Sequence, residues 1–141
     1  MIAGNICGVE VEVIGDKPKQ LSKWLWDSNP RELEEEEMSE YSPHIRFGKR
    51  GFSGALYKTD DFLKAHPFGT VPAAFSPEGN IGVFESNSIL RAVARSSNHA
   101  TLYGKNGYDA SRIDGFLDAN LVFAREAQVY LLEIQNITEE G

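Results

Sequence analysis

The chain opens with a strict alternation of apolar and acidic positions. Val9–Val13 reads Val-Glu-Val-Glu-Val, which predicts a half-buried strand, closed by a turn at Ile14–Asp16. The few residues before it, Ile2–Ile6, are enough for the end of a helix that Gly8 caps. We therefore expect a helix end followed directly by a strand.

Regular patterning resumes near residue 59. Thr59 is a suitable N-cap for a short helix, with two aspartates in the first turn, and Pro67 ends it. The segments Val71–Phe75 and Ile81–Phe84, joined by a proline- and glycine-containing turn, predict a β-hairpin. A second helix is expected to begin at Ser86.

The strongest periodic signal lies near the C-terminus, where apolar residues recur at three- and four-residue intervals. They are Ile113, Phe116, Leu117, Leu121, Ala124 and Leu131. This spacing predicts a helix over Ser111–Ile134, with Asp109 or Ser111 as its N-cap. From Leu121 onwards the helix is apolar nearly all round, so it requires burial on several sides.

Between these regions, residues 17–57 differ in composition. An acidic run is followed by arginines and a lysine among glycines, which favours a long insertion or flexible loop. Trp24 and Trp26 are unusual in such a segment. Two interpretations stay open for them: they fold back over a core edge, or they form a short linear docking site.

Composition narrows the class of protein. With 141 residues, 41% of them hydrophobic, the chain can form one domain or slightly more with a buried core. Its net charge of −7 disfavours nucleic-acid and membrane-surface roles. A single cysteine, Cys7, excludes an intramolecular disulfide and favours the reducing cytoplasm. No signal peptide, transit peptide or membrane span is recognisable.

The middle of the chain resembles a known family. Phe62–Ala73, followed by Phe84–Ile89 with its Glu-Ser pair, is similar to the N-terminal domain of the glutathione transferase superfamily, in the form found in the translation elongation factor 1-gamma family. The likeness is good over residues 58–97, extends to the 109–134 helix, and includes residues 2–14 weakly.

This resemblance implies an α/β fold. Residues 1–97 would form a thioredoxin-like domain with an insertion at 17–57, and residues 98–108 a linker. Residues 109–141 would begin the all-helical second domain with its first long helix. In the family an interior first strand, a loop with the catalytic Tyr, Ser or Cys, and most of a first helix precede the segment resembling Ile2–Asn5. We therefore expect the first strand to be missing and Val9–Val13 to have an open edge.

The resemblance also implies a glutathione site at Val71, Pro72, Glu85 and Ser86. In the family a cis Val-Pro lets the backbone of the valine pair with the tripeptide, while the Glu-Ser pair receives a carboxylate at a helix start. Without the resemblance, Ser86 is more simply an N-cap and Pro72 a turn residue. Thr70 stands where many relatives carry Lys or Gln near a glutathione carboxylate.

No catalytic residue is expected, because the family's catalytic segment has no counterpart. Cys7 falls at the wrong end of the first helix to replace it and is better explained as a small buried side chain. His44, His66 and His99 lack metal-ligand spacing, so surface or packing roles are expected. We predict no metal and no required cofactor, with glutathione as an optional ligand or substrate.

Three functions agree with these features. The leading one is a protein–protein scaffold in translation elongation that docks a guanine-nucleotide-exchange subunit or another transferase-fold chain, including a second copy in a homodimer. The alternative is a glutathione S-transferase that conjugates glutathione to electrophiles. A third is an appendage that assembles aminoacyl-tRNA synthetases. The open strand edge and the apolar final helix together predict self-association, binding of a partner chain, or poor folding.

Overall fold

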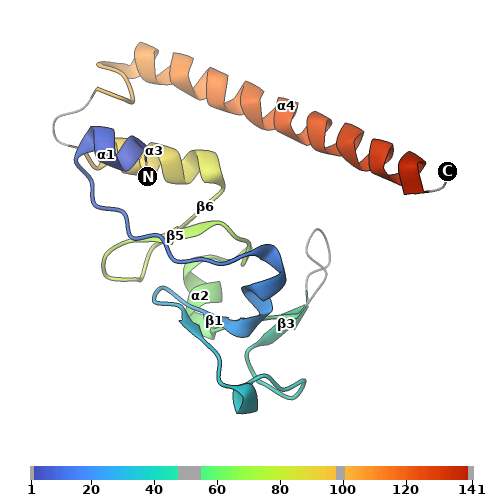
Figure 1. The fold of residues 1–141 in the computed structure, drawn as a ribbon. Coiled ribbons are helices and arrows are strands. Elements are labelled where there is room, and N and C mark those ends of the chain that lie inside the picture. The colour runs from blue at the N-terminus through green and yellow to red at the C-terminus, as the bar shows by residue number, and fades with distance from the viewer. Residues whose placement is uncertain (1, 48–54, 98–100, 140–141) are drawn as a thin grey trace. The chain divides into compact units, whose positions relative to one another are not determined.

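The computed structural model describes residues 2–47, 55–97 and 101–139. The chain divides into two compact units, each described by itself. We call Glu10–Ala92 the hairpin unit, and Met1–Val9 with Val93–Gly141 the terminal unit. The expected class is confirmed: mixed α/β structure with small sheets is followed by one long helix (Figure 1).

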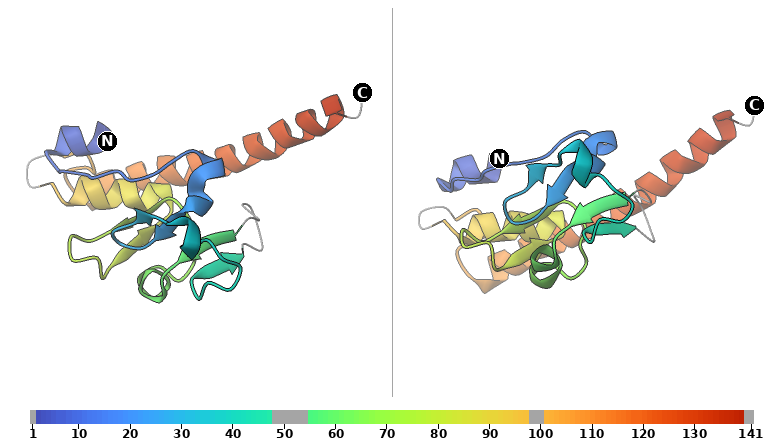
Figure 2. Two further views of the ribbon diagram at one scale, coloured as in Figure 1. Left: turned by 60° about the horizontal axis from the view of Figure 1, so that its bottom comes forward. Right: turned by 90° about the horizontal axis from the view of Figure 1, so that it is seen from below.

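The hairpin unit contains a four-stranded sheet in the order β2-β1-β4-β3. Its strands are β1 (Trp24–Trp26), β2 (Arg31–Glu32), β3 (Ile45–Phe47) and β4 (Ala55–Lys58), with 3-10 helices η1 (Pro18–Lys23) and η2 (Glu35–Glu37) beside them. The outer pairs, β2 with β1 and β3 with β4, are antiparallel. The central pair is parallel, with Leu25 opposite Tyr57. Figure 2 shows these strands from two further directions.

The interpretation of residues 17–57 as a loop is therefore wrong. The strands are only two to four residues long, which is too short for a period-two pattern to stand out among glutamates. Their aromatic and aliphatic residues nevertheless suit a pleated surface. Leu56 and Tyr57 of the interior strand β4 are both buried, so this segment contributes to the core.

The two tryptophans belong to this sheet. Trp26 is buried, and its indole Nε1 donates a hydrogen bond to the carbonyl of Leu21 at 2.9 Å. Its ring stacks on Trp24 with 5.8 Å between centroids. Of the two interpretations, the one in which a tryptophan covers the core is confirmed for Trp26.

The predicted strand at Val9–Val13 is wrong. These residues are irregular, and Val13 is 65% exposed. Within the described ranges no strand pairs with the segment. Alternation alone does not stabilise a strand, because its backbone groups need a neighbouring strand to bond.

The second half of the hairpin unit forms as expected. Helix α2 (Asp60–Ala65) begins after Thr59, whose hydroxyl accepts from the backbone N–H of Phe62 at 3.0 Å. Strands β5 (Ala73–Phe75) and β6 (Gly82–Phe84) pair antiparallel in a sheet of their own. Helix α3 (Ser86–Arg95) follows β6 directly.

The terminal unit begins with helix α1 (Ile2–Cys7), as predicted. Gly8 ends it in the left-handed region at φ 63°, and the N–H of Val9 bonds back to the Gly4 carbonyl at 3.0 Å. Glycine adopts this conformation without a steric penalty. Cys7 is buried, in agreement with a packing role.

The final helix, α4 (Gly107–Glu139), is confirmed and is longer than predicted. Its N-cap is neither Asp109 nor Ser111. Instead, the side-chain oxygen of Asn106 accepts from the N–H groups of Tyr108 and Asp109, at 2.9 and 3.1 Å. The Asp109 carboxylate bonds in return to the N–H of Lys105, which resembles a capping box. No helix in the described part of the chain has the length and apolar content to span a bilayer.

Gly82 sits where α2 meets β6. A Cβ there would lie 2.5 Å from the carbonyl oxygen of Ala65, so Gly82→Ala should destabilise the hairpin unit by about 1–3 kcal/mol through overpacking. Denaturant unfolding followed by tryptophan fluorescence reports this unit, because Trp24 and Trp26 both lie in it. Gly15→Ala is the control, since nothing lies within 4 Å of its Cβ position. Equal stability of the two variants would contradict the close contact.

Glu37 has a lowered pKa of about 2, against an ordinary value of 4.5. The main cause is its two-pronged hydrogen bond with Arg31, at 2.6 and 2.7 Å, followed by a bond from the N–H of Glu34. Because the folded-state pKa is lowered, the stabilisation is present above pH 4.5 and is lost as the pH falls towards 2. NMR titration of the Glu37 carboxyl should show this pKa, and Arg31→Gln should return it towards 4.5.

The matched control for this titration is Arg46→Gln, which breaks the ion pair between Arg46 and Asp60 (2.9 Å) elsewhere in the hairpin unit. This variant should leave the Glu37 titration unchanged. A Glu37 pKa near 4.5 in the unmodified chain would show that the bond with Arg31 does not persist in solution.

Candidate functional site

The hairpin register brings the predicted glutathione residues together. Ala73 of β5 pairs with Phe84 of β6. Val71 and Pro72 immediately precede this pair on one strand, and the Glu85-Ser86 dipeptide immediately follows it on the other. All four residues therefore lie at the same end of the hairpin, and all are exposed.

The peptide bond between Val71 and Pro72 is cis, as the resemblance implies. Val71 keeps 40% of its surface exposed and lies just outside the paired part of β5. Its backbone is thus placed at a strand end, where an extended peptide can continue the pairing.

Glu85 has a positive φ of 67°, in the left-handed region that residues other than glycine seldom adopt. Its carbonyl accepts from the N–H of Ile89 at 3.0 Å, which is the first bond of α3. Glu85 therefore occupies the N-cap position, and Ser86 is the first helical residue. The simpler interpretation of Ser86 as the N-cap is wrong.

This geometry suits an anion. The Ser86 hydroxyl is exposed at the start of a ten-residue helix, where backbone N–H groups and the helix dipole favour negative charge. A non-glycine residue held at positive φ is a common mark of a functional site. The sequence indicated both residues but not this backbone conformation.

His66 packs beside the candidate site. It is fully buried, and its ring stacks on Phe84 with centroids 5.1 Å apart and an interplanar angle of 2°. Its Nε2 lies 2.8 Å from the carbonyl of Thr70; because a carbonyl only accepts, Nε2–H is the donor. This bond anchors the residue that precedes Val71. The expectation of a packing role is confirmed for His66, although its link to the site was not foreseen.

The other ring nitrogen of His66, Nδ1, differs from Nε2 in its hydrogen bonding. Among the described residues, its Nδ1 is the one buried side-chain polar atom without a hydrogen-bond partner. Phe62 lies 5.6 Å from the same ring and also contacts Phe75 of β5. The remaining histidines take no part in this cluster: His44 is half-buried beside β3, and His99 lies outside the described residues.

The ammonium group of Lys58 lies near the loop that leads to Val71. Lys58 ends β4, and its Nζ would be 3.5 Å from a Cβ placed on Gly69. Burial, followed by the charge of Arg46, lowers the pKa of this ammonium. From the sequence, Thr70 was the one residue expected near a glutathione carboxylate in this region. The proximity of Lys58 was not expected. No group of three metal-ligating side chains occurs within residues 2–47, 55–97 and 101–139.

Known proteins with similar sequences are plant elongation factors and a plant glutathione transferase. Elongation factor 1-gamma 3 of rice (Oryza sativa subsp. japonica) is 43% identical over 65 residues, which are 46% of this chain and 15% of that protein. Elongation factor 1-gamma 1 of the same plant is 37% identical over 81 residues, 57% of this chain and 19% of the relative. Glutathione S-transferase F9 of Arabidopsis thaliana is 33% identical over 84 residues, 58% and 35% of the two chains.

The homologues are elongation factor 1-gamma and a glutathione S-transferase. The resemblance to the transferase superfamily in its elongation factor 1-gamma form is therefore confirmed. The chain spans less than a fifth of the length of these elongation factors and about a third of the transferase. No protein-family model matches it, and no solved structure matches it.

The backbone at Glu85 generates a testable ranking of variants. In the left-handed region an L-residue costs roughly 1–2 kcal/mol, and β-branched residues fit worst. Glu85→Gly should therefore leave stability unchanged or raise it by up to about 1 kcal/mol, because the strain relief is partly offset by the freedom of glycine when unfolded. Glu85→Val should lower it by about 1–2 kcal/mol. Denaturant unfolding measures the stability of both variants. If Glu85→Val were more stable than Glu85→Gly, the positive φ of Glu85 would be refuted.

Proposed function

We propose that the chain is a protein-binding scaffold in translation elongation, acting in the cytoplasm. Its partner would be a guanine-nucleotide-exchange subunit or another transferase-fold chain, a second copy of itself included. The observation that carries this proposal is the likeness to elongation factor 1-gamma, seen in several plant proteins at 37–43% identity.

The surface of α4 supports a binding role. Large apolar side chains along its second half are more than half exposed, namely Val122, Phe123, Val129, Tyr130 and Leu131. Exposed apolar groups in such density mark interaction surfaces. Covering them would recover about 25 cal/mol for each Å² removed from water.

The scaffold role is tested by immobilising the chain and adding the exchange-factor subunit of elongation factor 1. We expect saturable binding with one-to-one stoichiometry. A full-length elongation factor 1-gamma serves as the positive control and a plant glutathione S-transferase as the matched negative control. If the subunit binds the full-length factor but not this chain at about 100 µM, the exchange subunit is excluded as the partner. If the chain also binds no transferase-fold chain and no second copy of itself at that concentration, the scaffold proposal fails.

The alternative function is a glutathione S-transferase. Two observations favour a glutathione site: the left-handed Glu85 and the exposed Ser86 at a helix start. Glutathione would be ligand or substrate, and no further cofactor would be needed. Thiolate activation requires a donor aimed at the sulfur, typically worth about 3–4 kcal/mol. Ser86, the one hydroxyl among the four candidate site residues, is assigned to the glutathione carboxylate, so turnover of chlorodinitrobenzene by this chain should be absent or very weak.

Removal of the Ser86 hydroxyl tests the site without relying on turnover. Ser86→Ala should cost about 1.5–3 kcal/mol of glutathione affinity, roughly a 10- to 150-fold rise in Kd, through loss of a charge-assisted hydrogen bond. Calorimetry with glutathione measures this, and Ser111→Ala on α4 is the control. Equal affinities would remove Ser86 from the site. Absence of binding by the unmodified chain would exclude the enzyme while leaving the scaffold proposal intact.

A further inference from the structure

Asn106 is followed by Gly107 at the start of α4, and this is the one Asn-Gly pair in the sequence. In such a pair the backbone nitrogen of the second residue can attack the side-chain carbonyl carbon of the asparagine. A glycine in the second position offers the least steric resistance to this attack. Both residues are exposed, and nothing lies within 4 Å of the Cβ position of Gly107. The pair is therefore open to water.

The N-cap geometry holds the Asn106 amide over the backbone that would attack it. Its Oδ1 accepts from the N–H groups of Tyr108 and Asp109, at 2.9 and 3.1 Å. Its Nδ2 donates to the Asp109 carboxylate at 3.2 Å. The side chain is thus folded back towards the residues that follow Gly107. These bonds keep Cγ close to the Gly107 nitrogen and fix which way the amide faces.

The same cap favours the attack electronically. When a nitrogen adds to Cγ, negative charge develops on Oδ1, and preorganised N–H donors stabilise such charge. The positive end of the α4 dipole lies at the same place and acts in the same direction. Gly107 is the first residue of α4, and the N–H of a first helical residue has no carbonyl partner within the helix. The helix therefore does not hold back the attacking nitrogen.

We propose that Asn106 is a site of deamidation by water, and that this change loosens the first turn of α4. The Gly107 nitrogen loses its proton to water and attacks Cγ, which closes a succinimide ring. The bond between Cγ and Nδ2 breaks, and this nitrogen leaves as ammonia after taking a proton from water. A second water opens the ring, giving aspartate if it attacks Cγ and isoaspartate if it attacks the backbone carbonyl.

Neither product preserves the cap. Aspartate at position 106 keeps an acceptor for the N–H groups of Tyr108 and Asp109, but it places a carboxylate oxygen where Nδ2 stood, 3.2 Å from the Asp109 carboxylate. Two carboxylates at that distance repel each other. In isoaspartate the main chain runs through Cβ and Cγ, so the former cap oxygen becomes a peptide carbonyl. The loosening is therefore greater for isoaspartate.

The loop before α4 depends partly on the same cap. The Asp109 carboxylate also accepts from the N–H of Lys105 at 3.1 Å, and a Cβ on Gly104 would lie 2.5 Å from the Cβ of Asp109. The loop thus lies directly against the first turn of the helix. A second attachment does not involve Asn106, since the Tyr103 hydroxyl donates to Asp114 at 2.6 Å. Deamidation should therefore loosen the cap without detaching the whole loop.

Peptide mapping by mass spectrometry tests the modification itself. After incubation of the full chain in neutral buffer, the peptide that contains position 106 should gain the mass difference between an amide and an acid. It should do so before any other asparagine-containing peptide. Gly107→Ala should slow the reaction about tenfold, because a Cβ at position 107 hinders the attack. Gly115→Ala, also in α4 and also without a neighbour within 4 Å, is the matched control and should leave the rate unchanged.

Two results would overturn the assignment of the site. In one, another asparagine reacts before Asn106. In the other, Gly107→Ala deamidates as fast as the unmodified chain. Neither measurement uses glutathione or a partner protein, so the outcome is independent of the proposed function.

Hydrogen exchange tests the loosening of the cap. In the deamidated chain the N–H groups of Tyr108 and Asp109 should exchange about 5- to 30-fold faster, as expected from loss of an N-cap. Asn106→Asp reproduces one of the two products and keeps an acceptor at the cap, so it should show a smaller increase. Unchanged exchange of both N–H groups in the deamidated chain would overturn the loosening.

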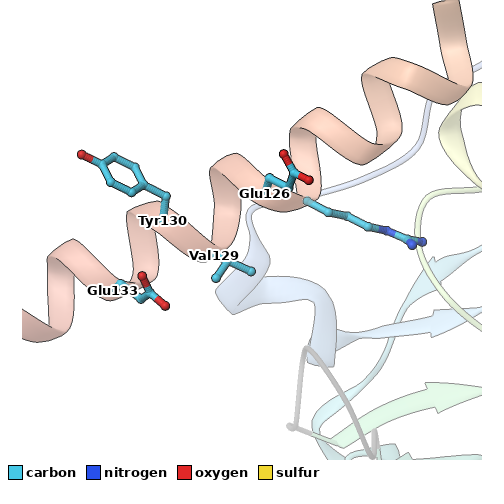
Figure 3. A pocket seen from close by; sticks show the side chains of 5 residues that line it. Glu126, Val129, Tyr130 and Glu133 are labelled. Carbon is cyan, nitrogen blue, oxygen red and sulfur yellow. The ribbon is translucent and has the colours of Figure 1, made fainter.

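The second half of α4 provides an internal control. Figure 3 shows a shallow hollow there, with Glu126, Val129, Tyr130 and Glu133 beside it. It begins about five helical turns after Asn106. The N–H groups of Val129 and Tyr130 should therefore exchange at unchanged rates after deamidation. Equal acceleration at both ends of α4 would indicate that the whole helix unfolds, and would overturn a change confined to the cap.

Discussion

The contact between the end of α2 and strand β6 is the constraint on which the hairpin unit depends. His66 follows α2, is wholly buried, and stacks on Phe84 of β6. Gly82 lets β6 approach the Ala65 carbonyl more closely than any side chain would permit. Interiors packed this densely tolerate little displacement. The helix, the loop that follows it and the hairpin are consequently positioned by one another.

The geometry of the candidate site depends on that contact between α2 and β6. The His66 hydrogen bond to Thr70 anchors the chain just before Val71, and the pairing of β5 with β6 carries Glu85 and Ser86 to the same end. None of the four site residues needs a long side chain to reach it, because the backbone places them.

Two segments of the chain differ in how much of their apolar surface is buried. Residues 17–57 supply a sheet with a buried centre at Leu56 and Tyr57, so this segment stabilises the hairpin unit. Helix α4 has the opposite character, since its second half exposes one apolar group after another. A helix in water is stabilised mainly by the surface that it buries. The exposed apolar side chains of its second half therefore support the proposed binding role rather than the core.

Local features could be predicted from the sequence by itself. Thr59 and Gly8 mark helix ends through chemistry within a few residues, and the period of α4 follows from its apolar spacing. The hairpin followed from its strand pattern and its turn residues, whereas the four candidate site residues were implied only by the resemblance to a known family. Only the tertiary structure decided whether Val9–Val13 and the short strands at 17–57 form a sheet. A strand needs a neighbouring strand that can lie far away in the sequence, so local residues do not identify its partner. The positive φ of Glu85 likewise could not be predicted from the residues next to it.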